Sequence, residues 1–547
     1  MRDKVTIIGA GPGGLASSIL LAAAGARVTL VEARDRVGGR TSSHEAEGFR
    51  FDTGPTFFLY PEVLESIFET AGRRLRDEIE LMPLDPLYRL HFGDGSTLDA
   101  TDDIALLSRR VGELSPADAE AVPRFFSDND KKFLSFLPFL QKAFLKSTDL
   151  LDPKLVRLLP TLAPWRQLDK ELERYFVDPR VRMAFSFQAL YLGMTPKTCP
   201  SLFSILPLIE YRYGVYHPRG GCGAVMDTMA RVAGELGVDI RLNSPVRGLH
   251  FDGRRVTGVE TDEERIEADA TVINADFADA MHRLVPSRLR RSWSDKRLAK
   301  QRYSCSTFMM YLGLEGRFDD QPHHTVYMPA DYQRHLEDID AATHMTPDPA
   351  FYAQNASVTD DSLAPEGHST LYMLMPVAHQ DDASRIDWAK EAPTYRKLAL
   401  KQLAKVGFTG VRERIRYERL LTPTQWRDDY FIHRGATFSM AHNFGQMLHR
   451  RPRNRYEDLD GVYLVGGGTH PGSGLPTIFE SARISTTLLS EDLGLGMSLA
   501  RTPVEAAIEA GVEEPSVGST PAADLPTPVR VERGPARPAR TRLTDTV

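Results

Sequence analysis

The chain has little cysteine, no excess of positive charge and no long apolar run. Its 547 residues include three cysteines, Cys199, Cys222 and Cys305, with no C-x-x-C pair, so neither a disulfide framework nor a zinc or other metal site is expected. The formal net charge of −7 gives no bulk attraction to nucleic acid, and no such partner is expected. No apolar stretch reaches the roughly 18–20 residues that span a bilayer.

The composition that is present is that of a globular protein of two or three domains. Hydrophobic residues make up 42% of the chain. The first strand begins almost at the N-terminus, and no secretory signal peptide precedes it. These features predict a cytoplasmic protein.

A glycine motif near the N-terminus is the most informative feature. An apolar run over 5–8 predicts a buried strand, which stops at Gly9. Gly9, Gly11 and Gly14 form a G-x-G-x-x-G pattern that leads directly into an Ala/Leu-rich helix. Such glycines allow a tight turn and let the backbone approach a pyrophosphate at the helix N-terminus. The pattern predicts a dinucleotide site.

The next strand adds a second part of this site. Residues 27–31 predict a strand that ends in Glu32, where an acidic side chain can hold a ribose hydroxyl. The run Asp-Arg-Val-Gly-Gly-Arg-Thr over 35–41 follows. It resembles the second fingerprint of FAD enzymes of the amine oxidase and carotenoid desaturase type, so FAD is the expected cofactor.

Two later segments bear on organisation. A strand over 461–470 ends in glycines and leads to a helix over 477–489, a second unit able to direct N–H groups at a dinucleotide. The segment 131–146 combines Phe and Leu with lysines. It fits either an interfacial membrane contact or a core helix with lysines at its solvent edge, and Pro138 is expected to break the helix.

Six further regions, in order, extend the resemblance to most of the chain. They are residues 184–190, 214–221, 323–326, 358–367, 434–439 and 463–476. Together with the N-terminal motifs they resemble the bacterial and fungal phytoene desaturase family, the FAD-dependent carotenoid desaturases, which also include diapophytoene desaturases. The likeness runs from residue 5 to about 493. It departs after Pro476, over 477–483, where many family members continue with small residues.

The resemblance implies an α/β fold with a Rossmann-like FAD-binding domain of the amine oxidase type, a mixed α+β substrate domain and a helical membrane-facing region. The expected division is 1–100, 211–280 and 441–497 for the FAD-binding domain, 101–210 for the helical substrate and membrane-associating region, 281–440 for the substrate domain and 498–547 for a disordered tail. The cofactor contacts that it implies are Gly9, Gly11, Gly13, Gly14, Glu32, Ala33, Gly39, Arg40, Thr41, Val246, Gly467, Gly468, Leu475 and Pro476.

The implied reaction introduces conjugated double bonds into a C40 or C30 polyisoprenoid, by hydride transfer to flavin and loss of a proton. Such a substrate implies peripheral attachment to the inner face of the membrane, with a quinone or oxygen as electron acceptor; a homo-oligomer stays open. Asp149 and His470 are candidate catalytic residues. The alternatives are an N-cap before Leu150 for Asp149 and a structural turn for His470.

Other functions stay open at this point. Within flavin chemistry, the chain could be a later-pathway carotenoid oxidase, isomerase or further desaturase, since these share the same flavin motifs. An amine oxidase is a further alternative, against which the mid-chain matches argue. A non-catalytic FAD-binding membrane protein belongs to a different class.

Overall fold

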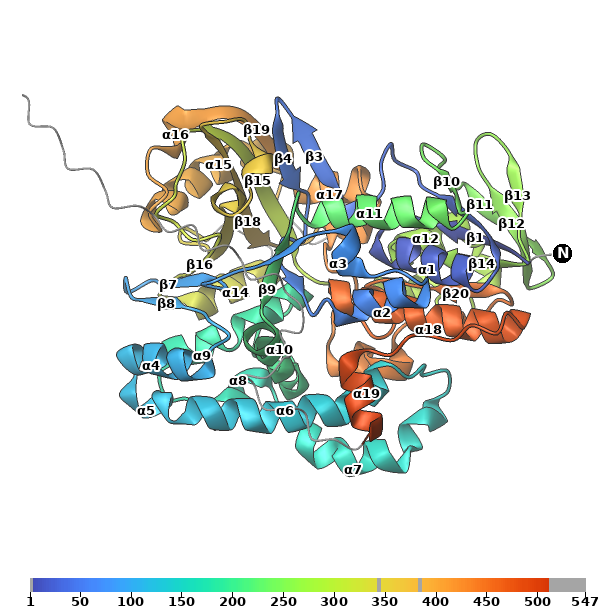
Figure 1. Cartoon of the computed structure of the whole chain (residues 1–547), viewed down its shortest axis with the longest axis horizontal. Helices are drawn as coiled ribbons and strands as arrows, with labels where there is room; N and C mark the ends of the chain where they lie inside the picture. Colours follow the sequence, from blue (N-terminus) through green and yellow to red (C-terminus); the bar gives the residue numbers. More distant parts are fainter. Residues whose placement is uncertain (1–2, 342–345, 382–385, 511–547) are drawn as a thin grey trace, which may run out of the picture.

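A parallel sheet built from distant parts of the chain positions the glycine motifs. The computed structural model describes residues 3–341, 346–381 and 386–510 (Figure 1). Five strands pair in the order β10-β2-β1-β14-β20, all parallel. They are β1 (Lys4–Ile8), β2 (Arg27–Val31), β10 (Asp239–Arg241), β14 (Ala270–Ile273) and β20 (Val462–Leu464). The start, middle and end of the chain therefore meet in one sheet.

The two faces of this sheet are covered differently. On one face α1 (Pro12–Ala23) packs between α11 (Cys222–Glu235) and α18 (Leu475–Leu493). The other face carries an antiparallel sheet of β11 (Gly248–Asp252), β12 (Arg255–Glu260) and β13 (Arg265–Glu267). Because side chains alternate along a strand, Ile7 packs with the helices whereas Ile8 packs with β11–β13. The predicted Rossmann-like α/β fold is confirmed.

A second, mostly antiparallel sheet forms the other large layer, in the order β19-β15-β18-β17-β16-β7-β8. Its strands are β7 (Arg89–Phe92), β8 (Thr97–Asp99), β15 (Ser306–Glu315), β16 (His324–Met328), β17 (Phe351–Gln354), β18 (His368–Val377) and β19 (Ile415–Leu421). Helix α15 (Trp388–Lys405) covers Phe308 and Met310 on one face. Tyr311 faces the other way, onto Phe51 of β4 (Phe49–Asp52). Strands β7 and β8 form an antiparallel hairpin, and β7 joins this sheet by parallel pairing with β16.

Residues 104–213 are mostly helical, and most of these helices lie in the lower part of Figure 1. They are α4 (Ile104–Leu114), α5 (Pro116–Ala119), α6 (Ala121–Leu140), α7 (Pro153–Leu162), α8 (Leu168–Leu172), α9 (Pro179–Ala184) and α10 (Ile205–Tyr213). Smaller elements are β3 (Ser43–Ala46), β5 (Phe58–Leu59), β6 (Leu81–Pro83), β9 (Val215–Pro218), α2 (Glu62–Thr70), α3 (Leu75–Glu78), α12 (Phe277–Leu284), α13 (Asp295–Ala299), α14 (Tyr332–Ala341), α16 (Val411–Arg414) and α17 (Pro423–Asp428). Among the described helices, none combines the length and apolarity that a bilayer crossing needs.

Helix α6 contains residues 131–140 of the segment that fitted either a membrane contact or a core helix, and it is a core helix. Phe133 and Phe136 are buried. Lys132 is only 3% exposed, and its Nζ donates to Ser204 Oγ at 2.9 Å and lies 3.5 Å from Glu171 Oε1. The expectation that Lys132 would sit at a solvent edge is therefore wrong. So is the expectation that Pro138 breaks the helix: α6 runs through Pro138 and ends two residues later, at Leu140. The missing N–H of Pro138 costs the helix one i→i−4 hydrogen bond, to the carbonyl of Leu134.

The start of the predicted disordered tail is ordered. Residues 498–510 lie within the described part of the chain, and 503–510 form α19 (Pro503–Ala510). Val504 is 4% exposed, and Glu505 Oε1 pairs with Arg483 Nη1 of α18 at 3.0 Å. This buried contact orders a segment for which the composition alone predicted disorder. Residues 511–547 lie outside the described residues.

Candidate functional site

The G-x-G-x-x-G turn lies at the carboxyl end of β1, and each glycine has a spatial reason. Gly9 has φ +96°, which favours glycine. A Cβ on Gly14 would lie 2.0 Å from Gly9 O, and one on Gly13 would lie 2.4 Å from Val465 Cγ1. No side chain caps the N-terminus of α1 at Gly11. The first N–H groups of α1 therefore have no helical partner and can bind an anion.

Glu32 stands at the end of β2 beside this turn. Its side chain is buried, with Oε2 accepting the Ala10 N–H at 2.8 Å and Oε1 accepting the Arg34 N–H at 3.0 Å. Burial raises the pKa of Glu32, although these hydrogen bonds oppose that shift. Each oxygen keeps a further lone pair for a ribose hydroxyl.

The second glycine motif folds against the first. Gly38 is left-handed at φ +97° and donates its N–H to Ala10 O at 2.7 Å, and a Cβ on Gly39 would lie 3.7 Å from Gly11 Cα. Arg40 Nη1 donates to Thr437 O at 2.8 Å. Burial lowers the pKa of Arg40, against the charge of Asp276.

The remaining predicted cofactor contacts lie at or near the same sheet edge. Thr41 is buried at the end of the second motif, and Val246 packs with Ile8 and Val31 beneath β2. Ala33 directly follows Glu32 and is partly exposed. As contacts of the cofactor these residues, like the others that the resemblance implies, stay predictions.

The late strand–glycine–helix unit supplies the other side. Gly466 follows β20 with φ +115°, and a Cβ on Gly468 would lie 2.8 Å from Phe277 Cβ. α18 begins at Leu475–Pro476 behind Gly474, again with no side-chain cap. The structure thus brings two uncapped helix N-termini, those of α1 and α18, to one edge of the parallel sheet.

Two residues at this edge were missed by the sequence analysis. Asn274, directly after β14, donates from Nδ2 to Gly9 O at 3.1 Å, and its place at a strand's carboxyl end was a usable signal. Arg451 is 1% exposed and donates to backbone carbonyls only. Its acceptors are Thr469 O, Ala441 O, Gln446 O, Met440 O and Gly467 O. Burial lowers the pKa of Arg451 to about 9.

The two catalytic candidates lie on different elements. His470 is buried behind the glycine turn, where its ring packs edge-on to Phe144 with centroids 5.2 Å apart. Burial lowers the pKa of His470 to about 3, so its ring is neutral near pH 7. Asp149 lies within a short 3-10 turn, 147–151, and its Oδ2 accepts the Lys146 N–H at 2.8 Å. Asp149 is therefore the third residue of the turn, where it accepts the N–H of the N-cap residue Lys146, and it is not itself an N-cap before Leu150.

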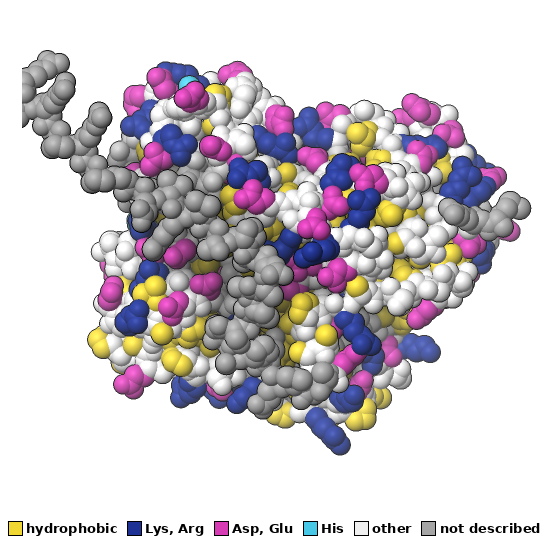
Figure 2. Space-filling model, in the orientation of Figure 1, with side chains coloured by type: hydrophobic (Ala, Val, Ile, Leu, Met, Phe, Trp, Pro, Cys, Tyr) yellow, Lys and Arg dark blue, Asp and Glu magenta, His cyan; other side chains and the backbone are white. Residues whose placement is uncertain are grey.

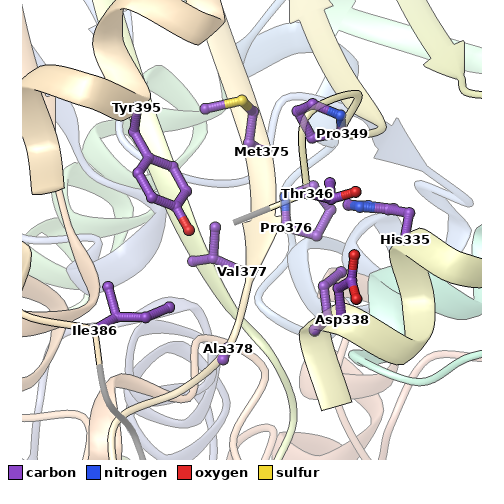
Figure 3. Close-up of a pocket in the computed structure, with 11 residues that line it drawn as sticks. His335, Asp338, Thr346, Pro349, Met375, Pro376, Val377, Ala378, Ile386 and Tyr395 are labelled. Atoms are coloured by element: carbon purple, nitrogen blue, oxygen red, sulfur yellow. The ribbon is translucent and has the colours of Figure 1, made fainter. Parts of the chain in front are cut away.

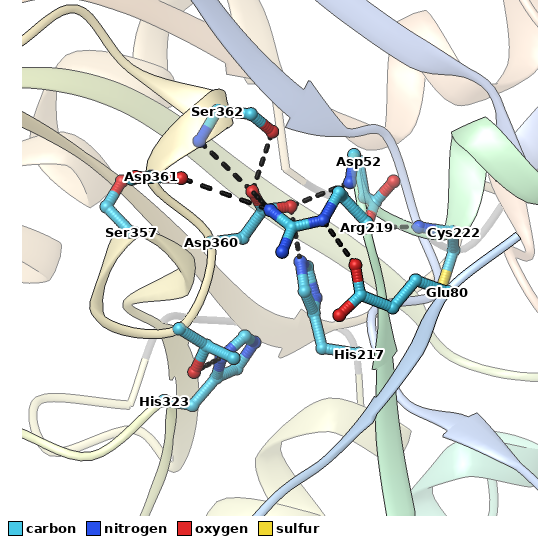
Figure 4. Close-up of polar contacts among 12 residues, drawn as sticks. Asp52, Glu80, His217, Arg219, Cys222, His323, Ser357, Asp360, Asp361 and Ser362 are labelled. Atoms are coloured by element: carbon cyan, nitrogen blue, oxygen red, sulfur yellow. Dashed lines mark hydrogen bonds and ion pairs between the residues drawn. The ribbon is translucent and has the colours of Figure 1, made fainter. Parts of the chain in front are cut away.

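The glycine-rich loop before α11 is not an open anion site. Asp52 occupies the helix N-terminus, accepting the Cys222 N–H at 2.9 Å and the Gly223 N–H at 2.8 Å (Figure 4). A Cβ on Gly221 would lie 2.6 Å from Asp52 Oδ1. Burial raises the pKa of Asp52. The carboxylate closes this helix, unlike α1 and α18.

Three of the mid-chain segments that carry the resemblance meet in one buried polar cluster, which we call the Asp360 cluster (Figure 4). Asp360 Oδ2 accepts from His217 Nε2 at 3.2 Å and from the Gly220 N–H at 2.7 Å, and Oδ1 accepts from Ser362 Oγ at 2.6 Å. The His323 ring lies 4.7 Å from that of His217, centroid to centroid. These hydrogen bonds hold the pKa of Asp360 below its usual value, against its burial.

The cluster continues to the turn that follows β4. His324 stacks on Phe57 with centroids 4.1 Å apart, and its Nδ1 lies 2.7 Å from Tyr352 Oη. Tyr352 Oη in turn lies 2.7 Å from Thr56 Oγ1. Burial lowers the pKa values of His323 and His324 far below the usual value. Both rings are neutral near pH 7.

A separate small cavity lies between α14, β18 and α15 (Figure 3). His335, Asp338, Met375, Val377 and Tyr395 are among its lining residues. It encloses about 20 Å³, room for a water molecule and far too little for a C30 hydrocarbon. It is no candidate for the substrate site.

The comparisons with known proteins agree with this geometry. Residues 12–488 match the family described as flavin containing amine oxidoreductase. The 4,4'-diapophytoene desaturase (4,4'-diapolycopene-forming) of Methylomonas sp is 40% identical, covering 89% of this chain and 95% of that protein. The all-trans-zeta-carotene desaturase of Myxococcus xanthus is 41% identical, covering 90% and 94%. Among solved structures, a double mutant of putrescine oxidase has a TM-score of 0.60 at 16% identity, covering 90% and 99%.

The chain belongs to the flavin-containing amine oxidoreductase family. Within it, the chain is an FAD-dependent oxidoreductase similar to the carotenoid desaturases, as its motifs predicted. The residues present fit FAD: two uncapped helix N-termini face a glycine-lined edge that has no room for a Cβ, and Glu32 stands where the ribose is expected.

Proposed function

We propose that this chain is a desaturase that introduces conjugated double bonds into a C30 or C40 polyisoprenoid such as diapophytoene or phytoene. The observation that carries the proposal is the similarity, at 40–41% identity over about nine-tenths of both partners, to two carotenoid desaturases. FAD, when bound, supplies the hydride acceptor for such a reaction. The glycine turns and helix N-termini support this role by offering a diphosphate site.

The residues of the chain would hold the cofactor and exclude water. Free N–H groups at the starts of α1 and α18 would bind the diphosphate, and Glu32 would bind the ribose. The neutral ring of His470 is buried between Phe144 and the glycine turn. An uncharged ring there allows an apolar polyene to approach without burial of a charge beside it.

The substrate class implies the partners. A C30 or C40 hydrocarbon is stored in the bilayer, so the protein would act from the cytoplasm on the inner face of the membrane. The electrons would pass from reduced cofactor to a membrane quinone or to oxygen. Assembly as a homo-oligomer is compatible with the proposal but is not required by it.

A second candidate acts later in the same chemistry. The zeta-carotene desaturase is as similar to this chain as the diapophytoene desaturase. A further desaturation of an already partly conjugated carotenoid therefore uses the same cofactor site. The two candidates differ only in the first substrate accepted.

Co-expression with a phytoene synthase or a diapophytoene synthase tests both. Loss of two-hydrogen units, with a red-shifted absorption and the corresponding mass, would support the primary proposal and give chain length and step count. Turnover of supplied zeta-carotene, with phytoene unchanged, would favour the second candidate. Bound FAD with no turnover of any polyprenoid would contradict both and favour a non-catalytic flavoprotein.

A further inference from the structure

The segment that follows α6 exposes large apolar side chains. Leu151 is 71% exposed, Val156 46% and Trp165 66%. They flank or lie on α7, whereas the Phe-rich α6 before it is buried. Three large apolar side chains this exposed lie within 15 residues of one another, on or beside one helix, and such a concentration favours an interaction surface.

The same segment carries positive charge in an otherwise acidic chain. Lys146, Lys154 and Arg157 are exposed, and none of them forms an ion pair within the described residues. Of its two acids, Asp152 pairs with Lys142 Nζ at 2.9 Å and also accepts the Lys154 N–H at 2.9 Å. Asp149 accepts the Lys146 N–H. We call these cations, with Leu151, Val156 and Trp165, the α7 face.

Figure 2 shows basic and hydrophobic side chains side by side at the bottom of the molecule, where Figure 1 places α7. The inner side of α7 is firmly packed. Leu155 and Leu162 are each 3% exposed and belong to one apolar cluster with Phe136 and Phe144. Since Phe144 also contacts His470, apolar side chains connect the α7 face to the flavin edge of the parallel sheet.

We infer that the α7 face docks on the surface of an anionic phospholipid bilayer. Trp and aliphatic side chains insert at the headgroup level, and Lys and Arg beside them bind anionic headgroups. A second copy of this chain fits less well, because a twofold contact would bring Lys146, Lys154 and Arg157 against their own copies. The inference rests on the proposed function, in which the substrate comes from the bilayer. It moves the membrane contact from the predicted segment 131–146, of which only Lys146 belongs to this face, to α7.

Vesicle co-sedimentation of the FAD-loaded full chain tests this. The probes are phosphatidylcholine vesicles with and without phosphatidylglycerol. The apolar variant is L151S/V156S/W165S, and its matched control is Val177→Ser, which is 76% exposed outside the segment. The charge variant is K146Q/K154Q/R157Q, and its matched control is K397Q/K401Q/R412Q, exposed on α15 and α16.

We expect wild type and both controls to bind vesicles containing phosphatidylglycerol. The apolar variant should bind these vesicles at least roughly tenfold more weakly than wild type. The charge variant should lose roughly fivefold in vesicle affinity for each cation removed, and only on vesicles that contain phosphatidylglycerol. Equal binding by wild type and both variants, or no binding by wild type, would overturn the inference. So would a variant that becomes monomeric with its vesicle binding unchanged, which would assign the face to self-association.

Turnover in detergent micelles separates this inference from the proposed function. Both variants should keep wild-type flavin absorbance and should turn over a carotenoid precursor supplied in micelles, where no bilayer is needed. Vesicle binding through the α7 face without turnover in micelles would contradict the proposed function alone. Turnover in micelles without vesicle binding would overturn the inference alone.

Discussion

The flavin edge of the parallel sheet and the Asp360 cluster are both buried and both join distant segments, but different atoms hold them. At the flavin edge most contacts fall on backbone atoms: glycines pack against neighbouring backbone, helix N-termini have no caps, and the side chains of Glu32, Asn274 and Arg451 bind backbone N–H or C=O groups. Around Asp360 the contacts are made largely by side chains with defined partners. The first region should tolerate no added atom. The second should tolerate replacement of a side chain by another that can form hydrogen bonds, but not its removal.

Adding one carbon at the flavin edge should have the largest effect. In Gly14→Ala the new Cβ would lie 2.0 Å from Gly9 O, so the turn must open. We expect loss of bound FAD, by more than about 100-fold in affinity, measured by flavin absorbance after gel filtration. Gly234→Ala is the control, because α11 has open space there and the change should stabilise by about 0.5–1 kcal/mol. Retention of FAD by Gly14→Ala would contradict the claim that the flavin edge tolerates no added atom.

Removal of the Arg451 side chain, which donates to five backbone carbonyls, should have the second largest effect. Arg451→Met leaves buried acceptors unpaired behind the glycine turn, and we expect a loss of about 4 kcal/mol in unfolding free energy. Urea unfolding measures this. Arg450→Met, at the exposed neighbouring position, should stay within about 0.5 kcal/mol. Equal stability of the two variants would contradict the role assigned to Arg451.

The Asp360 cluster should respond less to exchange than to deletion. Asp360→Ala leaves His217, the Gly220 N–H and Ser362 without their acceptor, and we expect a loss of about 3 kcal/mol. Asp360→Asn keeps one acceptor oxygen and should lose about half as much. Asp361→Ala is the control, since its side chain is 91% exposed. Denaturation midpoints that rank Asn with Ala would show that charge, not hydrogen bonding, holds this cluster.

Acid sensitivity should be the smallest single-residue effect. The pKa of His470 falls from 6.5 to about 3 on folding, so below pH 6.5 the unfolded chain binds a proton that the folded chain does not. Stability therefore falls as pH drops from about 6.5 towards 3. His470→Gln should reduce that slope by up to about 1.4 kcal/mol per pH unit. Unfolding free energies between pH 7 and 5 measure it, and an unchanged slope would contradict the assigned pKa.

The sequence predicts the flavin edge because its signals are local. A glycine that must sit against a neighbouring turn stands within a few residues of the strand that ends there, as Gly9 and Gly14 do. The Asp360 cluster has no such signal. Its histidines and acid were noticed in separate motifs, but only the folded chain shows that His217, His323 and Asp360 share one site.

Two failures have the same physical cause. Arg451 stands in a run of arginines that reads as solvated surface, and only its five carbonyl partners show that it is buried. Segments 131–140 and 147–166 both mix apolar residues with cations. The pairing of Lys132 with Ser204 and Glu171 buries the first, whereas Trp165 of the second is 66% exposed and has no comparable partner among the described residues. Burial of a charge depends on distant partners, which spacing does not encode.

The strand order of the parallel sheet also orders events during synthesis. β2 leaves the ribosome early, but β20 pairs beside β14 only after about 430 more residues, or roughly 20–90 s at common elongation rates. The α18 half of the cofactor edge does not exist before then. Stable cofactor loading is therefore a late event, and until it happens the nascent chain must keep the apolar strands of an unfinished sheet from aggregating.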